Sequence, residues 1–287
     1  MGEASVTAIV GVHGIGKYDY YLEAGHSVEG AAEAMRVKWD RYLHRSLAVT
    51  EGEAGAYVAE IAYFSHLLNE VEPAKRRAPE EEMDGPAQEV LAGWARELGV
   101  GEHLTGALKK FTGWLLDKLD TRAVAFAQMF APEVATYLTD ARRREQAQAV
   151  VASAVRRNRP QVVIAHSLGS VVAYETFWSN PDLKVELLIT LGSPLGMRNV
   201  IFERLLPTPI DGRGERPAGV GRWVNIADKH DIAAIPPLLD GSFAGVDEEH
   251  LVNLDWIDFH TAGKYLGCQA ISAHLRPYVT VPEPLVL

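Results

Sequence analysis

The sequence of 287 residues contains little cysteine and no long apolar stretch. Its one cysteine, Cys268, excludes an intrachain disulfide, which predicts a protein that does not depend on an oxidising compartment and favours the cytoplasm. No apolar run reaches the roughly 18 residues of a transmembrane helix. The first residues also lack the basic segment that opens a secretory signal, so neither a membrane span nor a signal peptide is expected.

The chain also lacks an excess of positive charge. Its 28 lysines and arginines are outnumbered by 38 aspartates and glutamates, for a formal net charge of −10. Because phosphate binding needs a concentrated basic surface, nucleic acid is excluded as the main partner. The one dense basic run, Arg142-Arg143-Arg144, is interpreted as a solvated helix face.

Apolar runs typical of strands alternate with helical patterns along most of the chain. Hydrophobic residues make up 47% of the sequence, enough for the core of one α/β domain with an insertion. Strands are predicted over 6–12, 56–64, 160–165, 185–191 and 222–227, and helices over 28–47, 139–157, 168–178 and 265–275. This alternation predicts the α/β class, with a mostly parallel central sheet and helices on both faces.

Residues 69–138 interrupt this alternation. A charged stretch with two prolines is followed by helical patterns over 87–98, 104–119 and 122–130, which carry several aromatic side chains. We interpret 69–138 as a helical cap or lid inserted into a core made of 1–68 and 139–287. The alternative interpretation is that these helices are further scaffold.

The strongest local signal is Ala165-His166-Ser167-Leu168-Gly169, between a predicted strand and a predicted helix. A nucleophile elbow places its serine on a tight strand-to-helix turn and needs small residues two before and two after it. Gly169 meets this need, and Ala165 adds one methyl group where the GxSxG pattern has glycine. The helix start favours an oxyanion, with the backbone N–H of Leu168 as one donor. The alternative role for Ser167 is a plain helix N-cap.

The loop after the first strand, GVHGIGKY over residues 11–18, fits two patterns. As an oxyanion loop, it would aim the backbone N–H of Ile15, or of Gly14, at a substrate carbonyl oxygen while His13 orients the loop. It also fits GxxxxGK of a phosphate-binding P-loop. However, Tyr18 stands where a P-loop needs a serine or threonine to hold Mg²⁺, so we favour the oxyanion loop.

The segments VHGIG, AHSLGSVVAYE and ITLGSPLG resemble those of bacterial α/β-hydrolases of the lipase-like and GPI-inositol-deacylase-like group. The resemblance covers the core on both sides of the insertion. It implies an α/β-hydrolase fold whose catalytic residues follow the chain order serine, acid, histidine. The implied activity is that of a serine hydrolase acting on a carboxylic ester, without a cofactor.

That order places the acid just beyond the last predicted strand, where both Asp228 and Asp231 stand. In similar hydrolases a WVN-type strand leads into an aspartate followed by small or apolar residues, which favours Asp231 over Asp228. The histidine is expected in a loop before the last helix. His260 lies there, a few residues before a tyrosine as in similar hydrolases, and is favoured over His250.

The expected mechanism is acyl transfer. His260 takes the proton of Ser167, and the N–H groups of Ile15 and Leu168 hold the oxyanion. Neither an HExxH motif nor a Cys/His metal spacing is present, so no catalytic metal is expected. The aromatic insertion suggests a small-molecule ester or thioester with a hydrophobic group. The same triad suits a thioesterase or an acyltransferase, and a non-catalytic binding module of the same fold is a further alternative.

Overall fold

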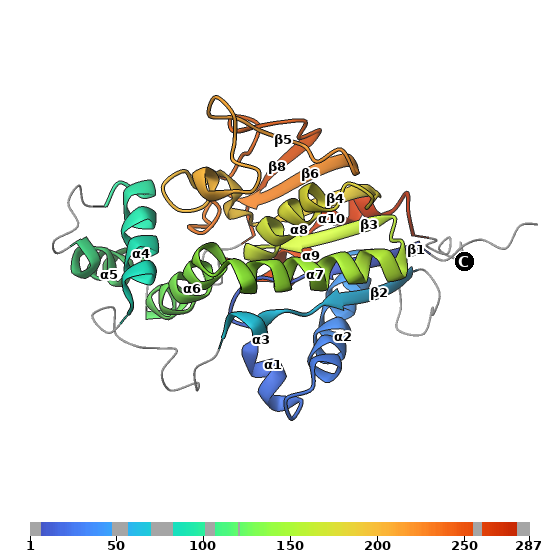
Figure 1. The fold of residues 1–287 in the computed structure, drawn as a ribbon, viewed down its shortest axis with the longest axis horizontal. Helices are drawn as coiled ribbons and strands as arrows, with labels where there is room; N and C mark the ends of the chain where they lie inside the picture. The colour runs from blue at the N-terminus through green and yellow to red at the C-terminus, as the bar shows by residue number, and fades with distance from the viewer. Residues whose placement is uncertain are drawn as a thin grey trace, which may run out of the picture.

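The computed structural model describes residues 7–47, 57–69, 83–100, 107–119, 121–254 and 260–279. Six of its strands form one sheet in the order β2-β1-β3-β4-β6-β8, with every neighbouring pair parallel. These strands are β1 (Thr7–Val12), β2 (Tyr57–Ala62), β3 (Val162–His166), β4 (Val185–Leu191), β6 (Val220–Asp228) and β8 (Glu248–Val252). The predicted α/β class with a parallel central sheet is confirmed, and the arrangement is consistent with an α/β-hydrolase-like fold (Figure 1).

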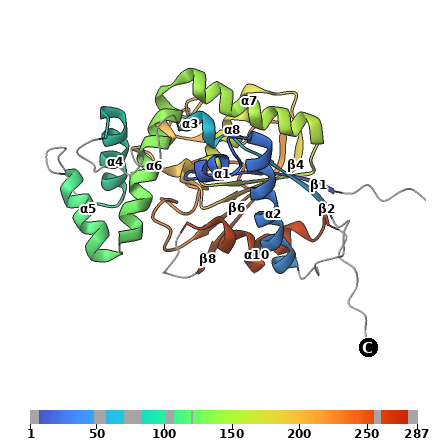
Figure 2. The same cartoon turned by 90° about the horizontal axis from the view of Figure 1, so that it is seen from below.

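Helices cover both faces of this sheet. On one face lie α2 (Val28–Leu47), α9 (Ala262–Leu266) and α10 (Gln269–Leu275); on the other lie α7 (Ala141–Asn158) and α8 (Leu168–Ser179). Seen from below in Figure 2, α7 and the pair α2 and α10 lie on opposite sides of the strands. In the central strand β3, alternate residues enter separate cores, with Val163 in one and Ile164 in the other.

The strand order reverses between β1 and β3. From β1 the chain passes to β2 at one side, and it later returns to β3 at the other side of β1. In parallel α/β sheets, such a reversal opens a crevice beyond the carboxyl ends of the two central strands, where ligands bind. The loop after β1 and the turn after β3 therefore meet at this edge.

Three helices lie within the predicted insertion 69–138: α4 (Gly85–Glu97), α5 (Ala107–Lys118) and α6 (Thr121–Thr139). They pack together at one end of the molecule, on the left of Figure 1, through the ring contacts of Trp94 with Phe111 and Phe130. Their core is continuous with the core under α7 and α8. Positions 70–82 and 101–106 lie outside the described residues, and the limits of the insertion stay a prediction.

Two predicted helices differ from the structure, and one strand of the central sheet was not predicted. The pattern over 122–130 continues as α6 through Pro132 to Thr139, because tertiary packing buries the residues that follow the proline. The last predicted helix is divided into α9 and α10 at Gly267-Cys268. The edge strand β8 was missed, since the polar residues at its start lack the apolar alternation of a strand. Positions 6 and 56, where two predicted strands begin, lie outside the described residues.

Several short elements complete the described chain. Two brief helices flank the ends of the first two strands, and a two-stranded ribbon and two 3₁₀ turns lie in the second half of the chain. They are α1 (Tyr18–Glu23), α3 (Ser65–Leu68), β5 (Gly214–Glu215), β7 (Phe243–Ala244), η3 (Pro194–Gly196) and η4 (Phe202–Arg204).

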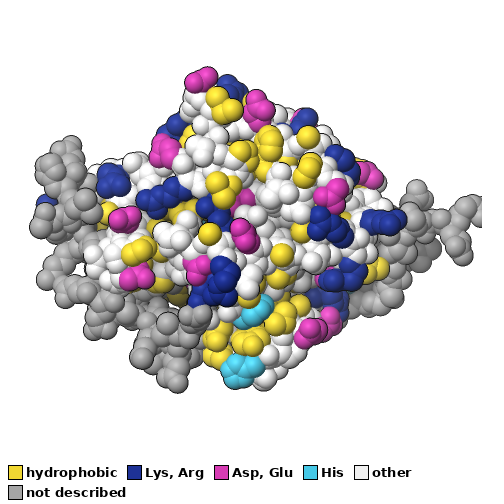
Figure 3. Space-filling model, viewed as in Figure 1, with side chains coloured by type: hydrophobic (Ala, Val, Ile, Leu, Met, Phe, Trp, Pro, Cys, Tyr) yellow, Lys and Arg dark blue, Asp and Glu magenta, His cyan; other side chains and the backbone are white. Residues whose placement is uncertain are grey.

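The surface drawn in Figure 3 carries charges of both signs. Lysine and arginine side chains lie interspersed with aspartate and glutamate over that face. It is therefore unlike the concentrated basic surface that binds a phosphate backbone. Among the described helices, none has the length and apolar character needed to cross a membrane.

The basic run at the start of α7 is not a solvated face, as the sequence suggested. Arg142 is exposed, but Arg143 and Arg144 are buried. Arg144 forms two hydrogen bonds with the buried carboxylate of Glu175 on α8, one of them from Nε at 2.8 Å. The Tyr137 hydroxyl donates to the same carboxylate at 2.7 Å. This buried ion pair ties α7 to α8, the helix that begins directly after Ser167.

Replacing Arg144 by methionine should lower the free energy of unfolding by about 3–5 kcal/mol, because the Glu175 carboxylate is then buried without its counter-charge. Arg142→Met removes an exposed arginine of the same run and should change stability by less than about 0.5 kcal/mol. Urea unfolding followed by circular dichroism measures both. Equal losses in the two variants would contradict the structural role of the pair.

Candidate active site

Ser167 occupies a strained turn between β3 and α8. Its backbone has φ 56° and ψ −134°, a positive φ that non-glycine residues seldom adopt. The end of β1 and the loop after it pack directly against Gly169. A Cβ added there would lie 2.3 Å from the carbonyl oxygen of His13 and 2.5 Å from that of Val12. Ala165, fully buried in β3, is accommodated with its methyl group. The glycine two residues after the serine is therefore the essential small residue of this elbow.

The structure brings three of the predicted residues into one hydrogen-bonded chain. His260 Nε2 lies 2.6 Å from Ser167 Oγ, and His260 Nδ1 lies 2.8 and 3.0 Å from the two carboxylate oxygens of Asp231. With Asp231 ionised, Nδ1–H donates to the carboxylate, and Nε2 is left to accept the hydroxyl proton. These side chains come from the turn after β3, the loop after β6 and the segment before α9. The arrangement can therefore act as a nucleophile with its general base.

The two alternates lie elsewhere. Asp228 ends β6, and its carboxylate accepts the N–H groups of His230 and Leu254, each at 2.9 Å, so it holds a turn and the chain after β8. His250 lies in β8, where its Nε2 is 2.7 Å from that of His274. Neither side chain contributes to the hydrogen bonds of His260 among the described residues.

Tyr265 holds the Asp231 carboxylate, a role that the sequence analysis did not foresee. Its hydroxyl donates to Asp231 Oδ2 at 2.7 Å and accepts the N–H of Asp228 at 2.9 Å. Burial and the Asp231 charge raise the pKa of Tyr265 well above its usual value, so the hydroxyl stays protonated and can donate. The N–H of Ala233 donates to Oδ1 at 2.9 Å. The sequence analysis used the tyrosine after His260 only to locate the histidine, and did not assign it a contact of its own.

His13 orients the loop after β1. The N–H of Phe64 donates to His13 Nε2 at 3.0 Å, so the ring proton is on Nδ1, which donates to the carbonyl oxygen of Gly14 at 2.7 Å. Burial lowers the pKa of His13 to about 3, so the ring stays neutral. In a trans peptide the N–H points opposite to the C=O. The N–H of Ile15 therefore points away from His13, as an oxyanion donor requires.

The same loop lies against the serine. A Cβ added at Gly14 would be 2.5 Å from Ser167 Cβ and 3.0 Å from Ser167 Oγ. The N–H of Leu168, at the first position of α8, has no acceptor within the helix by its position. The structure thus brings Gly14 and Leu168 directly beside the Ser167 side chain, with Ile15 next in the loop.

A carboxylate of α6 contacts this loop. Glu133 Oε1 accepts the N–H of Gly16 at 3.0 Å, and the side chain of Met129 also lies against Gly16. A P-loop uses its backbone N–H groups for phosphate oxygens, and a carboxylate at this position repels phosphate. The contact favours the oxyanion loop over the P-loop and links α6 to the site.

Helix α6 also covers His260. Phe126 meets the His260 ring edge-on, with the ring centroids 5.0 Å apart, and His166 lies on it at 4.8 Å. Burial and the neighbouring His260 lower the pKa of His166, which keeps that ring neutral. Ser167 has no exposed surface and His260 is 8% exposed. The described conformation is therefore closed over the nucleophile.

No protein-family model, curated protein or solved structure matches this chain. A functional assignment therefore depends on the contacts of Ser167, His260 and Asp231 and on the loop that lies against them.

Gly169→Ala should lower the free energy of unfolding by about 3 kcal/mol, because its methyl group overlaps backbone oxygens that cannot move aside. Gly113→Ala is the matched control. It adds a methyl group at an exposed position of α5 with no atom within 4 Å, and it should stabilise the protein by about 0.5–1 kcal/mol. Chemical denaturation measures both variants, and an unchanged midpoint for Gly169→Ala would contradict the close approach.

Proposed function

We propose that this protein is a serine hydrolase that cleaves a carboxylic ester through an acyl-enzyme. The single observation that carries the proposal is the continuous chain of hydrogen bonds from Ser167 through His260 to Asp231. A serine that only caps a helix accepts a backbone N–H and does not need hydrogen bonds to a histidine and an aspartate. Ser167 makes no side-chain cap hydrogen bond in α8, which argues further against a purely structural role among the described contacts.

In the first half of the reaction, Ser167 Oγ attacks the ester carbonyl carbon while its proton passes to His260 Nε2. The carbonyl oxygen becomes an oxyanion, stabilised by the N–H groups of Leu168 and Ile15. His260 then gives its proton to the leaving alcohol, and the acyl group stays on Oγ. Each oxyanion donor should contribute about 3–4 kcal/mol to the barrier reduction.

In the second half, water attacks the acyl carbon and His260 takes its proton. Collapse of the second tetrahedral intermediate releases the carboxylic acid and returns the proton to Ser167. Asp231 stabilises the imidazolium that forms in each half. Its carboxylate accepts hydrogen bonds from the Tyr265 hydroxyl and from the N–H of Ala233, which hold it in position.

The side chains around the site support a substrate with a hydrophobic group. Phe126 and Met129 of α6 lie against His260 and Gly16, and buried Ile15 follows Gly14, which lies against Ser167. Since Ser167 is fully covered, we infer that the side of α6 that bears Phe126 moves when the substrate enters. A single cysteine suits a reducing compartment, so we place this reaction in the cytoplasm.

A fluorophosphonate probe should label the wild-type protein once per chain, because an activated serine displaces fluoride from phosphorus. Ser167→Ala should lose all labelling. Ser179→Ala, which changes a serine at the far end of the same helix, should keep it. Intact-protein mass spectrometry measures the added mass. A folded wild-type protein that takes up no probe would instead support the non-catalytic binding module.

Asp231→Asn should lower kcat for a p-nitrophenyl ester by about 10⁴-fold, because an amide does not hold the required imidazole tautomer or stabilise its protonated form. Asp228→Asn should change kcat by less than about tenfold and act mainly on stability, since Asp228 accepts backbone N–H groups outside the chain of catalytic contacts. Steady-state kinetics on both variants decide between the two aspartates. The reverse order of losses would assign the acid to Asp228.

A further inference from the structure

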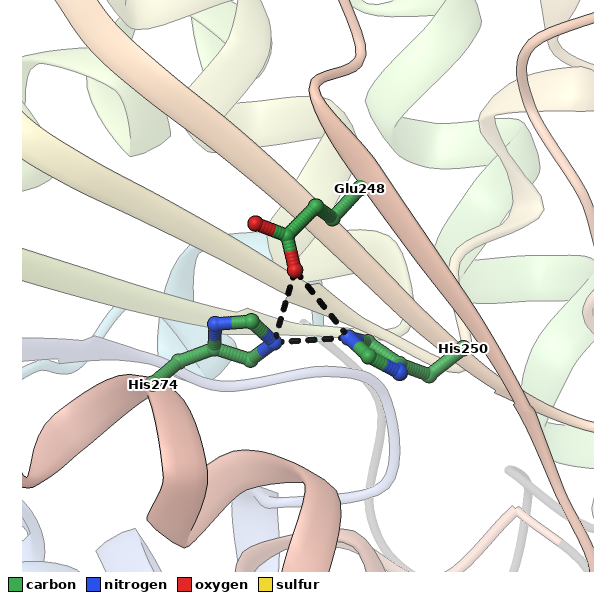
Figure 4. A group of neighbouring side chains, drawn as sticks. All are labelled: Glu248, His250 and His274. Carbon is green, nitrogen blue, oxygen red and sulfur yellow. Dashed lines mark hydrogen bonds and ion pairs between the residues drawn. The ribbon is translucent and has the colours of Figure 1, made fainter.

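Two histidines and a glutamate gather at the edge of the sheet, away from Ser167. Glu248 and His250 lie on β8, and their side chains share one face because they are two residues apart in a strand. His274 comes from α10, which packs beneath that face. Figure 4 shows the two imidazole rings facing each other through their Nε2 atoms, with one carboxylate oxygen of Glu248 above both.

The ligand atoms of this group lie close enough together to share one metal ion. The two Nε2 atoms are 2.7 Å apart, and Glu248 Oε2 lies 3.8 Å from each of them. A point in the plane of these three atoms lies about 2.0 Å from each, close to zinc bonds of about 2.0–2.1 Å to imidazole nitrogen and about 2.0–2.2 Å to carboxylate oxygen. A tetrahedral ion replaces the hydrogen bond between the two rings, so their Nε2 atoms move apart to about 3.3 Å, the separation of two ligands on such an ion.

We propose that Glu248, His250 and His274 bind a divalent transition-metal ion, for which zinc is the best match. Imidazole nitrogen with carboxylate oxygen is a ligand set that zinc accepts, and hard cations such as Mg²⁺ prefer oxygen alone. Glu248 is partly exposed, so water can reach the ion and complete a tetrahedron. The group is the one cluster of metal-ligating side chains with this spacing among the described residues.

The neighbouring Arg222 defines how the group is arranged without metal. It is hydrogen-bonded to Glu248 Oε1, which leaves Oε2 directed at the histidines. It also lies 3.2 Å from His274 Nδ1, so that nitrogen accepts and the ring proton is on Nε2, where it is donated to His250. The ion takes the place of this proton, which moves to Nδ1. The Arg222 side chain, about a third exposed, then turns from His274 and keeps its bond to Glu248.

A metal ion at this site would join the two elements on either side of His260 in the chain. His250 lies in β8, which comes before His260 in the chain, and His274 lies in α10, which comes after it. Since β8 is the edge strand and pairs with β6, the ion would stabilise that edge of the sheet. This role is structural, and no step of the proposed ester hydrolysis passes through it.

Isothermal titration of the full chain with zinc chloride, after removal of metal by a chelator, tests the proposal. The wild type should bind one zinc per chain, and zinc at about 100 times its Kd should raise Tm by about 3 °C or more. His250→Gln, His274→Gln and Glu248→Gln should each weaken binding by at least about tenfold, because even the loss of an outer-shell partner of a metal ligand costs that much. Glu248 is partly exposed, so Glu248→Gln should fold even if the variant of buried His274 does not.

The matched control is His26→Asn, which removes an exposed histidine between α1 and α2 and keeps a residue that tolerates the positive φ there. It should bind zinc as the wild type does. Equal affinity in the folded Glu248→Gln and His250→Gln variants, or no binding by the wild type, would overturn the proposal. Zinc binding is measured without any ester, so neither result bears on the serine hydrolase assignment.

Discussion

The contact between the loop after β1 and the first turn of α8 determines where each functional group lies. Gly169 touches the backbone oxygens of Val12 and His13, and Gly14 touches the Ser167 side chain. This approach is close enough to exclude a methyl group at either glycine. It holds the Ser167 hydroxyl, the start of α8 and the peptide between Gly14 and Ile15 close together. They meet where the strand order of the sheet reverses.

Around that contact, the buried charges are held by several partners each. Asp231 accepts hydrogen bonds from His260, Tyr265 and the N–H of Ala233, which take the place of hydrogen bonds to water. Glu175 is held in the same way by Arg144 and by further donors. The network around Asp231 orients the His260 ring, and the network around Glu175 fixes α8, which begins directly after Ser167. Both networks surround a buried carboxylate with several hydrogen-bond donors.

The sequence predicted the features that depend on residues adjacent in the chain. The elbow at Ser167 and the order of strands and helices follow from continuous apolar runs and small residues. The preference for Asp231 over Asp228 came from the resemblance to similar hydrolases, whereas the hydrogen bond from Tyr265 of α9 to Asp231 was not foreseen, because no local pattern encodes it. The burial of Arg144 was missed because its partner stands on another helix. The edge strand β8 was missed because a parallel partner, and not its own composition, makes it a strand.

The proline within α6 divides that helix into two parts with different attachments. Phe126 and Met129, which cover the site, precede Pro132, whereas Glu133 and Tyr137, which bond to the loop after β1 and to α8, follow it. Proline removes one backbone hydrogen bond and makes that point the easiest place for a helix to bend. The covering half can therefore tilt outward as a flap on a hinge while the anchored half keeps the loop after β1 in position.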